Sequence, residues 1–503
     1  MSQIRRQSII SSVVVYVGFA IGFLNTYLFT RQGSGFSESE YGLVGIFMAV
    51  AILMQSFAGL GMNAYIGKFF PYYHDHLPTK KNDLFSWSLL FSCIGFGLVL
   101  IVGIVLKNLV IQKYGTNSPE FVIYYNWVFP FGFGLTIFYI FEAFAWQIKK
   151  PILSNYLKEV QFRLLATVLI ILVTTGVIKS FDIFIKLYSF TYIVVAIILL
   201  IYLFYTHQVW LHFSLSKVTR RLFKKIVAYI SFVYGGMLVY SISSVFDTIL
   251  IAAALDDGLK LAGIYTLAQN LASLVQAPQR GIISSSMGPL SRAWKDKDMA
   301  KIDRIYHSSS INQLIFSVGM FLLIWLNFTD GITTFHLQSG YFDARWVFFF
   351  IGLMRIVDMG TGVNSQIIGT STLWRFDFIT GIILLAITLP LNYYLTKYQY
   401  GVIGPAIANL MSFTVYNAIR YWFLLSKFKL QPFNIKSLYT ILLGMASYFA
   451  CYYLLRDLHG FTGLIIRSSM FMALYAGGAF AMNLSPDLIP VWNVFKKKVG
   501  LGK

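Results

Sequence analysis

The chain has 503 residues, of which 57% are hydrophobic, 17% aromatic and only 12% charged. Soluble domains carry about 25% charged residues, so this composition excludes a soluble globular protein. The formal net charge is +20, but Lys and Arg are distributed as membrane topology requires, and no nucleic-acid partner is needed to explain them. The two cysteines, Cys93 and Cys451, lie in apolar runs and offer neither a disulfide framework nor metal-binding spacing.

Apolar runs long enough to cross a bilayer recur along the whole chain. A spanning helix needs about 20 mainly apolar residues. The first run, near residues 8–29, exceeds the roughly 7–15 residues of a signal-peptide core, so we interpret it as a spanning helix. The sequence therefore predicts an all-α polytopic membrane protein with fourteen spans: 8–29, 41–67, 84–106, 121–147, 152–174, 182–205, 226–251, 261–288, 305–327, 343–368, 376–395, 401–425, 437–455 and 462–484.

Most Lys and Arg residues lie at the N-terminus, in the even-numbered loops and in the C-terminal tail. Examples are Arg5 and Arg6, Lys224 and Lys225, and the run Lys496–Lys498. Because short cytoplasmic loops are enriched in Lys and Arg, this bias predicts that both termini are cytoplasmic.

A weak internal repeat accompanies this layout. At an offset of 221 residues the windows at 41–67 and 262–288 match at three positions: Gly42 with Gly263, Gln55 with Gln276, and Gly67 with Gly288. Many transporters carry such repeats. The sequence thus predicts a six-helix bundle at 1–205, a cytoplasmic linker at 206–225, a second bundle at 226–425, and two extra helices with a basic tail at 426–503.

The span at 261–288 carries a stripe of polar residues at helical spacing: Gln269, Ser273, Gln276, Arg280 and Ser284. This spacing keeps one face of a helix, and Pro278 beside it can open the backbone ladder. A water-filled cavity facing the stripe is the functional interpretation. Interhelical hydrogen bonding, with Arg280 extending to the membrane surface, is the alternative.

Charged residues inside other spans are the remaining candidates, because a charge in hydrocarbon is expensive and usually faces a cavity or a partner. Arg355 and Asp358 lie three apart on one face, either as a self-neutralising pair or as one that opens for an ion. Asp247 and Glu142 could bind H⁺ or Na⁺ for energy coupling, or pair with a neighbouring Arg.

Smaller polar stripes add further candidates for substrate binding. They include Gln55 and Asn63 in the second predicted span and Arg420 in the twelfth. Asp377, beside Arg375, is expected at headgroup level. The sequence has no HExxH, P-loop, Gly-x-Ser-x-Gly or paired-Cys motif, which predicts a protein that is not an enzyme and that holds no metal or other cofactor beyond a coupling H⁺ or Na⁺.

Three segments resemble the oligosaccharide flippases of the multidrug/oligosaccharidyl-lipid/polysaccharide exporter superfamily, the O-antigen and capsule translocases of bacteria. They are RRQSIISSVVVY at Arg5–Tyr16, SESEYGLVG at Ser37–Gly45, and LAGIYTLA at Leu261–Ala268. The fourteen-span layout extends the resemblance over essentially the whole chain.

The resemblance implies two six-helix bundles around a cavity that opens alternately to either side of the bacterial inner membrane. A cationic cavity would hold the phosphate or pyrophosphate of a polyprenyl-linked oligosaccharide while the tail stays among membrane lipids. Arg280 is then the first candidate contact, followed by Arg355 and Arg420. A polysaccharide polymerase and chain-length machinery are expected partners. The related lipid II flippases carry arginines in the first two spans, and this chain has none there, which disfavours lipid II as substrate.

Two other functions compete with the flippase hypothesis. A cation-coupled multidrug exporter of the same superfamily usually has twelve spans and a carboxylate-centred cavity. A polytopic glycosyltransferase or polysaccharide polymerase generally presents a sizeable outer loop with acidic catalytic residues, and the loops at 30–40, 107–120 and 328–342 are short and poor in clustered carboxylates.

Overall fold

The computed structural model describes the backbone of residues 3–487 and the side chains of residues 14–487. The predicted basic tail around Lys496–Lys498 and the side chains of Arg5 and Arg6 lie outside the described residues. Every regular element between residues 3 and 487 is a helix.

The chain forms two compact units, residues 1–263 and 264–503. The first unit contains α1 (Gln3–Thr30), α2 (Glu38–Ala58), α3 (Met62–His76), α4 (Leu84–Val105), α5 (Lys107–Tyr114), α6 (Pro119–Tyr124), α7 (Val128–Gln147), α8 (Pro151–Asn155), a π-helix (Tyr156–Gln161), α9 (Phe162–Thr174), α10 (Phe181–Ser189), α11 (Thr191–Tyr205) and α12 (Lys217–Ala254). Helix α13 (Gly258–Val275) begins in the first unit and continues into the second.

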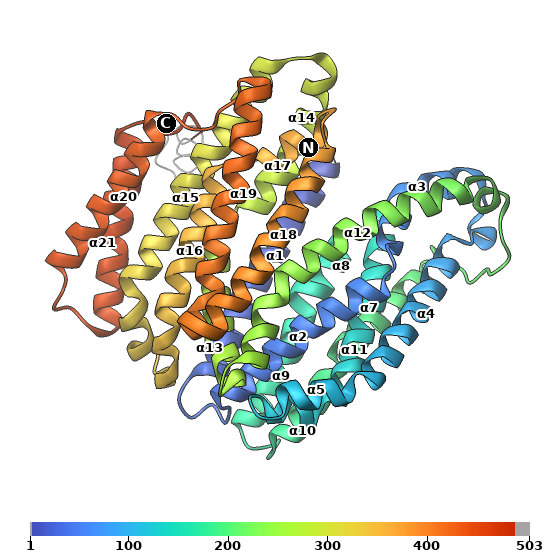
Figure 1. Cartoon of the computed structure of the whole chain (residues 1–503), viewed down its shortest axis with the longest axis horizontal. Helices are drawn as coiled ribbons and strands as arrows, with labels where there is room; N and C mark the ends of the chain where they lie inside the picture. The colour runs from blue at the N-terminus through green and yellow to red at the C-terminus, as the bar shows by residue number, and fades with distance from the viewer. Residues whose placement is uncertain (1–2, 488–503) are drawn as a thin grey trace. The chain divides into compact units, whose positions relative to one another are not determined.

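The second unit continues with α14 (Gln279–Asp296), α15 (Met299–Thr334), α16 (Ala344–Gly360), α17 (Asn364–Thr370), α18 (Arg375–Leu395), α19 (Gly404–Phe428), α20 (Ile435–Leu454) and α21 (Gly460–Ala481). The boundary between the units falls later than the predicted linker at 206–225, because α12 packs against α2 and α3 of the first unit (Figure 1). The predicted four-part division stays a prediction.

All fourteen predicted spans fall on helices. Within the described residues, nine helical segments are long and apolar enough to cross a membrane, or ten if the bent pair α16–α17 is one span. Helices α18 and α19 enter this number as one segment, although they pack against each other. The chain is thus a multi-pass membrane protein, while the exact number of fourteen spans stays a prediction.

Several predicted spans are divided between two helices, and in three of them the break has a clear backbone feature. Between α2 and α3 the backbone turns left-handed at Leu60 and Gly61. Between α13 and α14 the interruption includes Pro278, which lacks an N–H and disfavours helix before it. Between α16 and α17 the axis bends by 45°, and Gly362 has φ +64°. Interrupted backbone at membrane depth is tolerated only inside protein or beside a water-filled cavity.

The predicted repeat pair Gly42 and Gly263 marks a close helix crossing in the first unit. A Cβ atom on Gly42 would lie 1.8 Å from the Leu259 carbonyl oxygen, and one on Gly263 would lie 2.4 Å from the Glu38 carbonyl oxygen. An ion pair of 3.2 Å between Lys260 and Glu38 lies beside the crossing. Helix backbones approach this closely only where side chains are absent.

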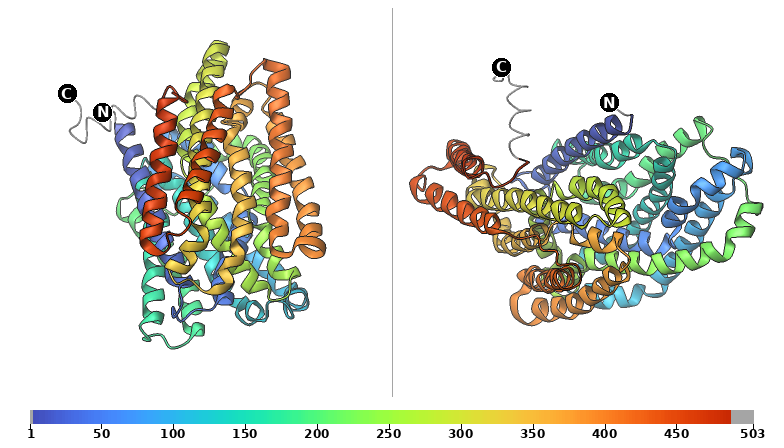
Figure 2. Two further views of the ribbon diagram at one scale, coloured as in Figure 1. Left: turned by 90° about the vertical axis from the view of Figure 1, so that its left-hand side faces the viewer. Right: turned by 90° about the horizontal axis from the view of Figure 1, so that it is seen from above.

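The two predicted extra helices, α20 and α21, pack against each other and along α15 (Figure 2). At one end of this contact the Arg467 guanidinium, on α21, forms an ion pair with Asp330 of α15. It also donates a 2.7 Å hydrogen bond to the Leu458 carbonyl oxygen. The ion pair therefore fixes α21 and the preceding loop to the long helix α15.

The crossing at Gly42 generates a stability prediction. We expect Gly42→Ala to lower the free energy of unfolding by about 1–3 kcal/mol, as overpacked positions do. Gly67→Ala is the matched control, because a Cβ on Gly67 meets nothing within 4 Å and the change is neutral or stabilising by up to about 1 kcal/mol. Thermal unfolding of the purified variants in detergent measures the difference. Equal transition temperatures for the two variants would contradict the close crossing.

Candidate functional site

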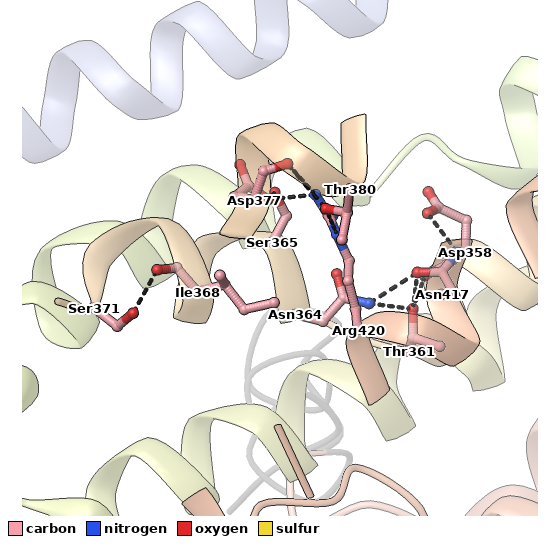
Figure 3. Close-up of polar contacts among 10 residues, drawn as sticks. All are labelled: Asp358, Thr361, Asn364, Ser365, Ile368, Ser371, Asp377, Thr380, Asn417 and Arg420. Atoms are coloured by element: carbon pink, nitrogen blue, oxygen red, sulfur yellow. Dashed lines mark hydrogen bonds and ion pairs between the residues drawn. The ribbon is translucent and has the colours of Figure 1, made fainter. Parts of the chain in front are cut away.

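A network of polar side chains surrounds the break between α16 and α17 in the second unit (Figure 3). Asn417, on α19, is its centre. Its Oδ1 atom accepts hydrogen bonds from the Thr361 hydroxyl at 2.9 Å and the Asn364 amide at 2.8 Å. Its Nδ2 atom donates to Asp358 Oδ1 at 3.3 Å. Asn417 is 2% exposed, so these bonds replace water at the broken helix.

Asp358 is held by amides rather than by a cation. Its second carboxylate oxygen accepts a 2.9 Å hydrogen bond from Gln279 Nε2 at the start of α14. Gln276 in turn donates to Gln279 Oε1. Among the described residues, Arg355 and Asp358 form no ion pair with each other, although they lie one turn apart on α16.

Arg420 forms a second cluster with α18. Its side chain is 3% exposed and forms an ion pair with Asp377, whose side chain is 33% exposed. Arg420 Nε donates to Thr380 at 3.1 Å, and the guanidinium lies over the Tyr416 ring at 3.9 Å from its centroid. Asp377 thus neutralises a buried arginine, while its expected position at headgroup level stays a prediction.

The predicted polar stripe at 261–288 is divided between two helices. Gln269 and Ser273 lie on α13, Gln276 lies in the break, and Arg280 lies on α14. The interruption at 276–278 agrees with the expectation that Pro278 can open the backbone ladder, while the cavity facing the stripe stays a prediction. Arg280 is exposed, and no ion pair or hydrogen bond of its side chain occurs within the described residues.

A separate charged cluster occupies the first unit beside a π-helix. Glu142, on α7, has a side chain only 4% exposed and pairs with Lys158 at 3.3 Å. The Lys158 ammonium also lies 4.4 Å from the Tyr139 ring centroid. The next residue, Glu159, pairs with Arg163 at 3.0 Å. π-Helical turns are frequent at functional sites, and this one turns two consecutive charged residues toward different partners.

The remaining predicted site residues lie on α2, α3, α12 and α16. Gln55 is buried on α2, and the Oδ1 atom of Asn63 on α3 is buried with no hydrogen-bond partner among the described residues. Asp247 is 3% exposed on α12, and Arg355 is half-buried on α16. No group of three or more His, Cys, Asp and Glu side chains suited to a metal ion occurs within the described residues.

Sequence reasoning missed several members of the second-unit network, namely Gln279, Asn417, Thr361, Asn364 and Thr380. A signal existed for Asn417, which precedes Arg420 by three residues and so shares its helix face. Each of the others is a common polar residue with at least one partner 40 or more residues away, as in the Arg420–Thr380 bond.

Comparisons with known proteins agree with this architecture. A family model described as polysaccharide biosynthesis protein matches residues 4–294. The solved structure of the lipid II flippase MurJ in an inward closed conformation has a TM-score of 0.71 and 17% identity, covering 96% of this chain and 100% of that one. An inward-facing multidrug resistance MATE family transporter of the MOP superfamily has a TM-score of 0.60 and 15% identity, covering 82% and 97%.

A third structure, a MOP superfamily transporter from Pyrococcus furiosus, has a TM-score of 0.54 and 14% identity, covering 83% of this chain and 94% of that one. No curated protein sequence matches the chain. At these identities the structures establish a shared fold. All three are flippases or transporters by description, in agreement with the expectation that the chain is not an enzyme.

The Arg420–Asp377 pair allows a test of whether Arg420 stabilises the fold or binds a ligand. We expect Arg420→Ala to destabilise the protein by somewhat less than the about 3–5 kcal/mol of a broken buried pair, because a third of Asp377 is exposed. Asp377→Leu combined with Arg420→Met should recover most of that loss. Thermal unfolding of single and double variants measures the coupling.

The exposed pair Lys186–Asp182, at 2.7 Å, is the control for this cycle, and Lys186→Ala should change stability by less than about 1 kcal/mol. Additive effects of the Arg420 and Asp377 substitutions would show that the pair is not coupled.

Proposed function

Because the chain belongs to the polysaccharide biosynthesis protein family, whose model matches more than half of it, we propose that it flips a polyprenyl-linked oligosaccharide across the bacterial inner membrane. The substrate would carry a phosphate or pyrophosphate and move from the cytoplasmic to the outer leaflet for O-antigen or capsule synthesis. A sugar-phosphate headgroup cannot cross hydrocarbon unaided, and a transporter fold supplies the polar passage.

The observation that carries this proposal is the broken span at α13–α14. Arg280 is the second residue of α14, and its guanidinium is exposed without a partner in the described part of the chain. A helix N-terminus favours an anion, and the α14 N-terminus has no side-chain cap. Guanidinium and backbone N–H groups together suit a phosphate. Arg420, already neutralised by Asp377, is the weaker candidate for the same contact.

Interrupted helices at corresponding positions of two halves are typical of transporter binding sites. Here the break at 59–61 and the break at 276–278 fall in the two windows of the predicted repeat. Alternating access by movement of two bundles is the mechanism that this arrangement favours. Cytoplasmic termini and cooperation with a polymerase and chain-length partner belong to the same proposal.

Energy coupling is assigned to Asp358 in preference to Glu142. Lys158 already neutralises Glu142, whereas Asp358 accepts hydrogen bonds from the amide groups of Gln279 and Asn417. Binding H⁺ or Na⁺ to a carboxylate among neutral groups removes an uncompensated charge and rearranges the bonds to Gln279 and Asn417. Since Asn417 holds the α16–α17 break, ion binding can alter that break. Asp247 remains a further candidate.

A cation-coupled multidrug exporter is the second candidate function, favoured by the same carboxylate. In that case Asp358 would contact a cationic substrate directly, and Arg280 would repel it. The flippase function therefore requires the positive charge of Arg280, whereas the exporter function is hindered by it.

The first test replaces Arg280 in a strain that lacks the native gene. We expect Arg280→Ala to reduce surface glycan at least about tenfold, while lipid-linked oligosaccharide accumulates inside, because a charged hydrogen bond to phosphate is worth about 1.5–3 kcal/mol. Arg280→Lys should restore part of the activity. Arg292→Ala, an exposed arginine on the same helix, is the control. Normal surface glycan in Arg280→Ala cells at wild-type protein level would refute the assignment.

The second test concerns coupling. We expect Asp358→Asn, which keeps the shape and an acceptor oxygen for one of the two neighbouring amides, to lower thermal stability by about 1–3 kcal/mol. The variant should lose the dependence of flipping on an imposed H⁺ or Na⁺ gradient in proteoliposomes. Glu142→Gln, measured in parallel, should keep that dependence. An Asp358→Asn protein that responds to the gradient as the wild type does would exclude Asp358 as the coupling site.

A further inference from the structure

The start of α12 carries exposed basic side chains, and neither it nor the segment that joins α11 to α12 contains an acidic residue. There is no Asp or Glu between Asp182 and Asp247. The first turns of α12 present five exposed basic residues: Lys217, Arg220, Arg221, Lys224 and Lys225. None of them forms an ion pair within the described residues. A positive surface of this kind attracts an anionic partner.

The preceding residues 207–216, here called the strap, expose apolar side chains beside this positive surface. Trp210, Leu211, Phe213 and Leu215 are 39%, 52%, 52% and 47% exposed. The strap is not helical and follows the end of an apolar helix, so these side chains lie near the membrane surface. Exposing apolar side chains to water is unfavourable, whereas Trp and its apolar neighbours are stabilised at a membrane interface.

Buried hydrogen bonds hold the strap in place. Asp83 is fully buried, and its Oδ2 atom accepts from the Ser216 N–H at 2.9 Å and the Thr219 hydroxyl at 2.7 Å. The Ser86 hydroxyl accepts from the His212 N–H at 2.6 Å. Because these contacts fix both the strap and the start of α12, the basic and apolar groups form one preorganised surface.

The electrostatics of α12 also point to an anion. Basic residues in the first turns of a helix oppose its macrodipole. Lys217 and Arg221, Arg220 and Lys224, and Arg221 and Lys225 are each four residues apart, so like charges repel along one helix face. Asp83 is the carboxylate at the start of α12, but it is buried and accepts hydrogen bonds from Ser216 and Thr219. The exposed basic side chains form no ion pair within the described residues, and an external anion would reduce their mutual repulsion.

The length of α12 places this end at the bilayer surface. Its 38 residues span about 57 Å at about 1.5 Å per residue, whereas the hydrocarbon core is about 30 Å thick. The charged third must therefore protrude into the headgroup region. In Figure 1 the start of α12 lies beside α3, whose following loop adds Lys80, with its ammonium 5.2 Å from the Trp210 ring centroid.

We propose that the strap and the first turns of α12 form a docking surface for anionic phospholipid headgroups of the adjacent, cytoplasmic leaflet. The basic side chains bind lipid phosphates, and the apolar strap inserts between the headgroups. The surface is continuous with the membrane-embedded part of α12, so bilayer lipid is the occupant nearest to it. This inference does not depend on which substrate the protein transports.

The test is native mass spectrometry of the full-length protein in detergent, titrated with phosphatidylglycerol or phosphatidylcholine. We expect wild type to bind phosphatidylglycerol more tightly, and Arg220→Gln/Arg221→Gln/Lys224→Gln/Lys225→Gln to bind it at least about tenfold more weakly, since each basic residue near an anionic surface contributes measurably. Phosphatidylcholine binding should not change.

A matched control removes the same charge from the second unit. Arg292, Lys295, Lys297 and Arg304 are exposed but interspersed with Asp296, Asp298 and Asp303, so their replacement by Gln should change phosphatidylglycerol binding by less than about twofold. The charge-preserving Arg220→Lys/Arg221→Lys variant should bind as wild type does, which separates charge from folding. Three results would each overturn the proposal. They are an equal loss of phosphatidylglycerol binding in the two Gln variants, wild-type binding by the α12 Gln variant, and binding of an acidic protein segment in place of the lipid.

Discussion

Hydrocarbon does not solvate charge or unpaired backbone groups, and this constraint organises the polar side chains of the protein. Glu142 pairs with Lys158, Asp377 with Arg420, and Asp330 with Arg467. Each pair joins different helical elements, so neutralising a charge also fixes a helix contact. Asp358 differs in that it accepts hydrogen bonds from two amide groups, and the proposed coupling role rests on this difference.

The broken helices follow from the same constraint. At 361–363 the backbone leaves the helix, where the Ser309 hydroxyl accepts from the Val363 N–H at 3.3 Å and the Ser310 hydroxyl donates to the Gly360 carbonyl oxygen. Asn417 links the Thr361 and Asn364 side chains beside this break. At 276–278 the break places Arg280 at the start of a new helix. The proposed phosphate contact rests on this position, because a flippase would have to replace the water around a phosphate with fixed donors.

The positions of the helices could be predicted from the sequence, because apolar runs bounded by basic loops leave few alternatives. Gly42 and Gly263 were recognised as a repeat pair, and the structure places them at a close crossing in the first unit. The break at Leu60 could not be predicted, because Leu is an ordinary helix residue. The pairing of Asp377 with Arg420 joins residues 43 positions apart, and no local pattern encodes it. The sequence shows the polar stripe from Gln269 to Ser284 with Pro278 inside it, and the structure breaks the helix at 276–278.

The central claim is that the protein moves a phosphate-linked glycan across a bilayer. Purified protein in proteoliposomes, loaded with a polyprenyl-pyrophosphate oligosaccharide on one leaflet, tests it most directly through the exposure of the glycan to an enzyme added on the other side. The account predicts that exposure rises with time far faster than in protein-free vesicles, and that the Arg280→Ala protein loses most of this rate. Exposure at the protein-free rate, or equal flipping of the same glycan on an uncharged polyprenol, would contradict it.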